Sequence, residues 1–139
     1  MTRPGGHRGV PHTADLRIEA WGPTRAECLA QAVRGVCESF LDLTGAVAGR
    51  TREVLLRADR DEDVLVALLE EVVYWLDTED EVPLDVELAP VAGGLRARLR
   101  MADAATLPVT GAAPKAVTLH GLAVSRGPRG WTCSVTIDV

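Results

Sequence analysis

The sequence predicts an α+β fold: a single domain in which a mostly antiparallel sheet carries two helices. Alternating apolar and polar residues, typical of half-buried strands, recur along the chain and are interrupted by two stretches with helical apolar spacing. Four expected strands follow one another at the end of the chain, which favours antiparallel hairpins over repeated strand–helix–strand units. The length of 139 residues suits one domain with one hydrophobic core. We therefore expect the element order β-α-β-α-β-β-β-β.

The first half of the chain supplies both helices. Residues 1–10 are rich in glycine, proline and arginine and are expected to form a flexible tail, so that the domain spans residues 11–139. Thr24 and Glu27 form a capping box, a pattern that marks the start of a helix. The expected elements are a strand over 14–21, a helix from 24 to about 43, a short strand over 52–58 and a more buried helix over 60–79.

The second half is expected to consist of strands joined by turns. Pro83 should start a new element, and Gly93-Gly94 is typical of a hairpin turn. Arg96, Arg98 and Arg100 should face outward, opposite acidic side chains of the preceding strand. The expected elements are strands over 84–90 and 95–101, a loop over 102–113, a strand over 113–124, a turn over 127–130 and a last strand over 131–139.

Composition and charge exclude several classes of protein. The formal net charge of -5 argues against broad electrostatic binding of nucleic acid. The cysteines, Cys28, Cys37 and Cys133, are odd in number and lack C-x-x-C spacing, which favours free thiols in a reducing compartment. The N-terminus has no apolar signal segment, and no run approaches the roughly 18 apolar residues of a membrane helix. We therefore expect a cytoplasmic protein without membrane contact.

Two aspartates at opposite ends of the domain are the first candidate site. Asp15 starts the first strand and Asp138 ends the last one, both on the polar face. If these strands are antiparallel neighbours, the carboxylates converge, and Val139 adds a carbonyl or its own carboxylate. Such hard oxygen donors suit Ca²⁺ or Mg²⁺ better than Zn²⁺. The alternative is that both aspartates are solvated strand ends.

Polar residues on the 113–124 strand and before the first strand are further candidates. His120 shares a strand face with Thr118, Lys115 has the opposite parity, and His12 precedes the first strand by three residues. A histidine paired with an aspartate can act as a general base, but surface or packed histidines are more common on strands. No serine or cysteine lies in a recognisable nucleophile turn. The acidic run 77–81 is either a solvated helix end or a docking site for a basic partner.

Four short motifs occur in order along the chain. They are H-T-A-D at 12–15, followed by the A-W-G-P-T turn, V-Y-W-L-D-T-E at 73–79, K-A-V-T-L-H-G-L at 115–122 and the terminal I-D-V. In these motifs, and in length and element order, the sequence resembles the archease family from about residue 12 to residue 139. It departs from the family pattern at Leu119, where an aromatic residue is expected, and over 109–114, which lacks acidic residues.

The resemblance implies a small accessory protein of the RtcB-type RNA ligase rather than an enzyme. That ligase joins an RNA 2′,3′-cyclic phosphate or 3′-phosphate end to a 5′-hydroxyl, as in tRNA splicing, with GTP and Mn²⁺. Archease-like proteins promote guanylylation of the ligase and its multiple turnover. The resemblance further implies that a divalent metal is held by Asp15, Asp138 and the main-chain oxygen of Val139. Calcium is the first expectation, with magnesium or manganese as alternatives.

Individual roles for the remaining motif residues do not follow from the resemblance. His12, Lys115, Thr118 and His120 are expected to contact the metal ligands or the partner. Two other functions stay open: a stand-alone metal-dependent phosphoesterase that uses Asp15, His120 and Asp138, and a general chaperone or adaptor. Strong direct binding of nucleic acid is not expected, given the acidity of the chain.

Overall fold

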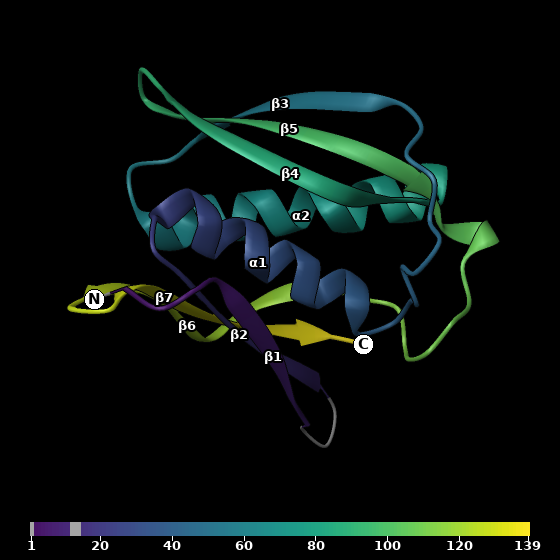
Figure 1. Ribbon diagram of the computed structural model, residues 1–139, viewed down its shortest axis with the longest axis horizontal. Helices are drawn as coiled ribbons and strands as arrows, with labels where there is room; N and C mark the ends of the chain where they lie inside the picture. Colours follow the sequence, from purple (N-terminus) through teal and green to yellow (C-terminus); the bar gives the residue numbers. More distant parts are fainter. Residues whose placement is uncertain (1, 12–14) are drawn as a thin grey trace.

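Two antiparallel sheets enclose a layer of two helices in residues 2–11 and 15–139, which the computed structural model describes (Figure 1). One sheet has the strand order β1-β2-β7-β6 and the other has the order β3-β5-β4. The elements are β1 Gly6–Pro11, β2 Asp15–Gly22, α1 Arg25–Glu38, β3 Thr51–Arg57, α2 Asp61–Glu79, β4 Glu81–Val91, β5 Gly94–Asp103, a 3₁₀ turn Ala104–Thr106, β6 Ala116–Gly127 and β7 Gly130–Asp138.

The predicted fold class is confirmed, and from β2 onward so is the predicted order of helices and strands. The strands form two sheets instead of one. A second layer is needed because both helices lie between the sheets and bury side chains toward each of them. Across the described part of the chain, neither helix combines the length and the apolar composition that a membrane span requires.

The prediction of a flexible tail over residues 1–10 is wrong for residues 6–10, because Gly6–Pro11 forms β1 and pairs with β2. Glycine serves this pairing directly. Gly6 lies opposite Trp21, and a Cβ atom at Gly6 would approach the indole ring within 2.6 Å. In the sequence, such a glycine indicates mobility. In the structure, its lack of a side chain allows the strand to pass close to an aromatic ring.

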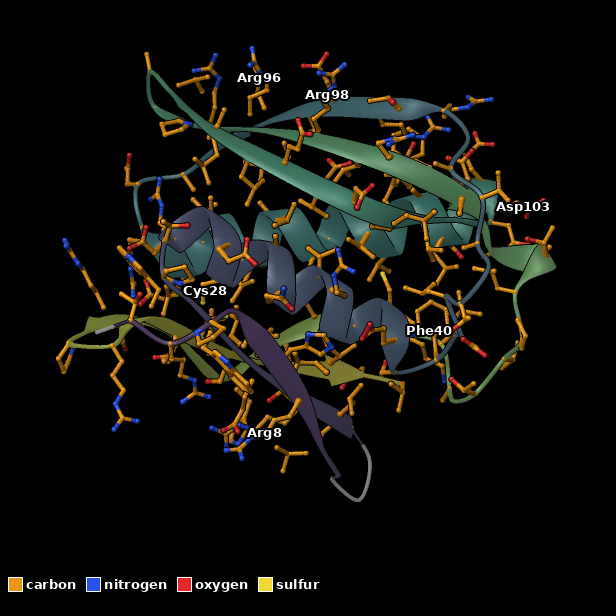
Figure 2. All side chains as sticks on the ribbon, in the orientation of Figure 1. Arg8, Cys28, Phe40, Arg96, Arg98 and Asp103 are labelled. Atoms are coloured by element: carbon orange, nitrogen blue, oxygen red, sulfur yellow. The ribbon has the colours of Figure 1, made fainter. Side chains whose placement is uncertain are left out.

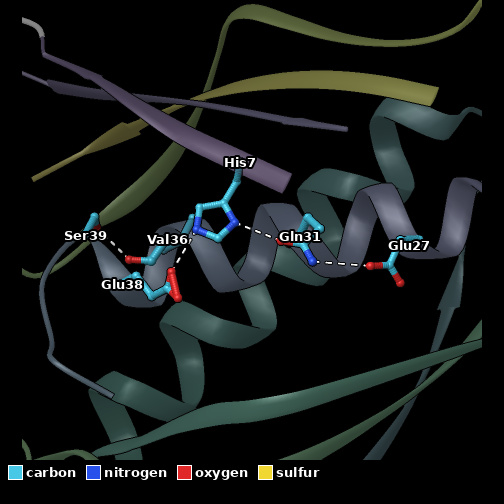
Figure 3. Close-up of polar contacts among 6 residues, drawn as sticks. All are labelled: His7, Glu27, Gln31, Val36, Glu38 and Ser39. Atoms are coloured by element: carbon cyan, nitrogen blue, oxygen red, sulfur yellow. Dashed lines mark hydrogen bonds and ion pairs between the residues drawn. The ribbon is translucent and has the colours of Figure 1, made fainter. Parts of the chain in front are cut away.

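A hydrogen-bond network fastens β1 to α1 (Figure 3). The Gln31 amide nitrogen donates to Glu27, which turns the Gln31 oxygen toward His7 Nδ1 at 2.8 Å. The other ring nitrogen, His7 Nε2, lies 2.8 Å from Glu38 Oε2. Because β1 leads into β2, this network also anchors the hairpin that carries Asp15.

Helix α1 lies at the centre of the core. Its N-terminus has the first half of the predicted capping box, with the Glu27 N–H donating to the Thr24 hydroxyl at 3.1 Å, while the Glu27 side chain accepts from Gln31. The helix ends at Glu38 instead of near residue 43, and Phe40 continues the core as part of the connection that follows (Figure 2). Buried side chains surround the helix because sheets lie on both sides of it; they are Cys28, Leu29, Ala32, Val33, Val36 and Cys37.

The second sheet covers α2 and is tied to it by charged and aromatic side chains. Arg52 Nε donates to Glu81 at 2.8 Å, and its guanidinium lies 3.6 Å from the ring centroid of Trp75. Strand β4 begins at Glu81, before Pro83, and a register shift between Pro83 and Asp85 accommodates the proline. Arg96 and Arg98 point away from the helices on the outer face of β5 (Figure 2).

Candidate functional site

The two candidate aspartates lie directly opposite each other. Strand β2 pairs antiparallel with β7, and the register places Asp15 opposite Asp138 at the end of the sheet. The neighbouring pair, Leu16 and Ile137, faces the core, so the aspartates lie on the outer face. Directly opposite residues in such a ladder have Cβ atoms about 4.5–5.5 Å apart. The structure thus confirms that the two strands are antiparallel neighbours and that the two aspartates occupy directly opposite positions.

Strand β6 brings the third motif to the same place. Ala116 lies opposite Asp138 on the side away from Asp15, and the Lys115 N–H donates to the Asp138 carbonyl oxygen at 2.7 Å. The main chain of Lys115 is therefore fixed beside the aspartate pair, while its side chain is exposed. Val139 follows Asp138 and is half-buried.

Thr118 and His120 are separated from this regular pairing by a bulge. The register between β6 and β7 shifts between Thr118 and Ala123, around Gly121 with a φ of +69°. The His120 N–H donates to the Thr118 hydroxyl at 3.3 Å, and the Ser134 hydroxyl donates to the Gly121 carbonyl at 2.9 Å. Because the register passes from the pair Thr118–Thr136 directly to Ala123–Ser134, strand parity does not place His120, and its common face with Thr118 stays a prediction. His12 lies outside the described residues.

The donor atoms at this end of the sheet fit a hard cation. Like charges directly opposite each other destabilise a strand pair, and a divalent ion would neutralise that repulsion. Two carboxylates and a main-chain oxygen are ligands of the kind that Ca²⁺ and Mg²⁺ prefer. Within residues 2–11 and 15–139 no group of three or more His, Cys, Asp or Glu side chains is arranged to hold a metal. Since Ca²⁺ takes about 6–8 oxygen ligands, water or a second molecule would complete its coordination.

A groove of about 1130 Å³ lies between the second half of α2 and the start of β6. Three of the four sequence motifs contribute to it, from 73–79, 115–122 and the terminal Ile-Asp-Val. The sequence shows these motifs, but it does not predict that they line one groove, because the packing of α2 against β6 is a contact between distant segments. The lining residues are Glu70, Val73, Tyr74, Leu76, Asp77, Asp80, Ala112, Ala113, Pro114, Lys115, Ala116, Val117 and Val139.

Comparison with known proteins decides the family. Residues 7–139 match the family described as the Archease protein family (MTH1598/TM1083). The chain belongs to the archease family. A probable protein archease from Mycobacterium tuberculosis (strain CDC 1551 / Oshkosh) is 58% identical over 134 residues, which cover 96% of this chain and 75% of that protein. A protein archease from Archaeoglobus fulgidus is 30% identical over 138 residues, which cover 96% of this chain and 98% of the relative.

Two solved structures share the fold of this archease. The solution structure of protein 1598 from Methanobacterium thermoautotrophicum has a TM-score of 0.76 at 20% identity and covers 96% of this chain and 99% of its own. The crystal structure of an archease and possible chaperone (TM1083) from Thermotoga maritima has a TM-score of 0.67 at 21% identity and covers 100% and 98%. At these identities the similarity supports the fold alone.

Proposed function

We propose that this archease activates an RtcB-type RNA ligase in the cytoplasm, in tRNA splicing and RNA repair. It would promote guanylylation of the ligase and its multiple turnover. The observation that carries the proposal is the placement of Asp15 opposite Asp138 at the end of the sheet, beside the groove formed by the family motifs. Membership of the archease family supports the same assignment.

In this proposal the chain delivers a charged group to the ligase and performs no chemistry itself. Asp15, Asp138 and the main-chain oxygen of Val139 would hold a divalent ion, with calcium the first expectation and magnesium or manganese as alternatives. When bound, the ion supplies positive charge that neutralises the negative charge developing on phosphates in nucleotidyl transfer. The pairing of β2 with β7 sets the spacing of the two carboxylates, and the Lys115 N–H holds the end of β7 in place.

The Cys37 thiol is unsuited to covalent catalysis. Cys28, Cys37 and Cys133 are all buried, and burial raises the pKa of the Cys37 thiol to about 12. A thiol with such a pKa stays protonated at neutral pH and is a poor nucleophile. Cys37 therefore serves the core. The contact between the other two thiols raises the pKa of Cys133 and lowers that of Cys28.

Multiple-turnover RNA joining by the ligase tests the proposal. RNA joined per ligase molecule is measured with GTP and metal, in the presence of the parent chain, Asp15→Asn, Asp138→Asn or the matched control Asp59→Asn, which alters an exposed aspartate in a loop. We expect the parent and the control to raise turnover equally and the two site variants to lose the stimulation. Equal stimulation by all four proteins would contradict the metal site.

A general chaperone is the second candidate function, because the solved Thermotoga maritima neighbour is described as a possible chaperone. This role predicts that the chain suppresses aggregation of unrelated unfolded proteins, and that chelating divalent metal leaves the protection unchanged. Light scattering of a heated client protein with and without the chain measures it. Protection restricted to the ligase would favour the first proposal.

A further inference from the structure

We infer that the groove between α2 and β6 is the docking surface for the ligase and receives an extended, basic segment of that protein. The inference rests on the proposed function and names the contact through which the two proteins meet. The groove combines an apolar floor with an acidic rim. Val73, Leu76 and Val117 are half-buried on the floor, and Tyr74 at the rim is 54% exposed.

The charge of the groove specifies a basic occupant. Its rim carries the exposed carboxylates of Glu70, Asp77 and Asp80 and one base, Lys115. Among the described residues no basic side chain forms an ion pair with those three carboxylates, whereas Glu81, at the end of the same acidic run, is paired with Arg52 at 2.8 Å. The rim therefore keeps a net negative charge, and electrostatic complementarity favours a segment rich in lysine or arginine.

The sheet edge beside the groove specifies an extended occupant. Strand β6 is the last strand of its sheet and pairs on one side with β7; within residues 2–11 and 15–139 no strand pairs with its other side. Such an edge presents unpaired main-chain N–H and C=O groups, to which a segment of another protein can add as a further strand. Ala116 and Val117, at the start of β6, line the groove, so a segment bound there reaches both the edge and the acidic rim of α2. The bulge after Thr118 limits the regular edge to a short stretch.

The groove is continuous with the aspartate pair. Val139 lines the groove and follows Asp138, and Lys115, which also lines it, donates its N–H to the Asp138 carbonyl oxygen. A segment held in the groove would therefore end next to Asp15 and Asp138. Docking at this surface places the carboxylates, with any ion they hold, against the surface of the ligase next to that segment.

Charge reversal on one helix tests the docking surface. The double variant Glu70→Lys/Asp77→Lys removes two acidic groups from the rim. The matched control is the double variant Asp63→Lys/Glu79→Lys, which changes the net charge by the same amount. Both of its residues are exposed on the same helix and neither lines the groove. The dissociation constant for a purified RtcB-type ligase is measured by isothermal titration calorimetry at low and high salt, after circular dichroism has shown that each variant is folded.

We expect the groove variant to bind at least about tenfold more weakly, with a smaller dependence on salt, and the control to bind within about twofold of the parent. Equal weakening by the groove variant and the control would overturn the inference, as would a parent chain that does not bind the ligase.

The variant Asp138→Asn separates this inference from the proposed function. Introduced into the parent and into the Glu70→Lys/Asp77→Lys protein, it should abolish the stimulation of guanylylation, whereas the charge reversal in the groove should weaken ligase binding by the same factor in both backgrounds. A parent chain that binds through the groove but leaves guanylylation unchanged would refute the proposed function and leave the docking surface standing. If the parent chain stimulates the ligase and the groove variant binds as tightly as the parent, the docking surface is refuted and the proposed function remains.

Discussion

Replacing Asp138 by asparagine should stabilise the protein in the absence of divalent metal. Asp138 lies directly opposite Asp15 and is exposed, so solvent screens the repulsion from its side, whereas Asp15 is half-buried and its Oδ1 atom is buried. Two unit charges about 5 Å apart, the Cβ spacing of directly opposite residues, repel by about 1 kcal/mol in a water-like dielectric. Asparagine has nearly the same shape and removes one charge. We therefore expect Asp138→Asn to raise the free energy of unfolding by about 0.5–1 kcal/mol.

Calcium should reverse this order. An ion that binds only the folded state stabilises it by RT ln(1 + [L]/Kd), about 2.7 kcal/mol at a hundredfold excess over Kd. The parent should gain this stability and the variant little of it. Urea unfolding followed by circular dichroism, with EDTA or with calcium, measures both effects, and Asp59→Asn serves as the control for the loss of an exposed aspartate. A variant less stable than the parent in EDTA, or an equal gain from calcium in both proteins, would refute the reasoning.

Three further predictions concern the core and the N-terminal strand. Arg52→Ala should lower the free energy of unfolding by about 2–3 kcal/mol, because it removes a half-buried ion pair and the stacking on Trp75. The control Arg50→Ala changes a side chain that is 64% exposed and should lower it by less than about 0.5 kcal/mol. Similar urea midpoints for the two variants would contradict this prediction. His7→Ala should lower the free energy of unfolding by about 1–2 kcal/mol and speed amide hydrogen exchange in β1, because it removes the side-chain contacts to α1. Unchanged exchange in β1 would mean that strand pairing alone holds this strand. Burial raises the pKa of Cys37 from 9 to about 12. As the pH rises above about 9, the thiol ionises in the unfolded chain before it does in the folded one, so the free energy of unfolding should fall. Urea titrations at several pH values should show a smaller fall for Cys37→Ser than for the parent.

The sequence predicts best those features that depend on local periodicity. Alternation along β2 and β7 places Asp15 and Asp138 on one face, and antiparallel pairing then brings the end of one strand to the start of the other. The cap at Thr24 is predicted equally well, because it needs only residues within one helical turn. Whether Asp15 and Asp138 bind a metal stays a prediction.

Features that depend on contacts between distant segments escape such reasoning. The pairing of β1 with β2 depends on the close approach of Gly6 to Trp21. The sequence alone shows only a glycine in a glycine-rich segment, which indicates flexibility. The bulge in β6 follows from the positive φ of Gly121, so strand parity does not place His120. The groove arises because α2 lies against β6, and the motifs that form it are about forty residues apart in the sequence.

The rate of ligase–GMP formation tests the central claim most directly. A purified RtcB-type ligase is mixed with labelled GTP and metal, and the covalent product is followed over time with the parent chain, with Asp15→Asn/Asp138→Asn or with no addition. We predict a faster rate with the parent chain and, with the double variant, the rate of the ligase alone. A rate that the parent chain leaves unchanged, under conditions in which the two proteins bind, would contradict the account.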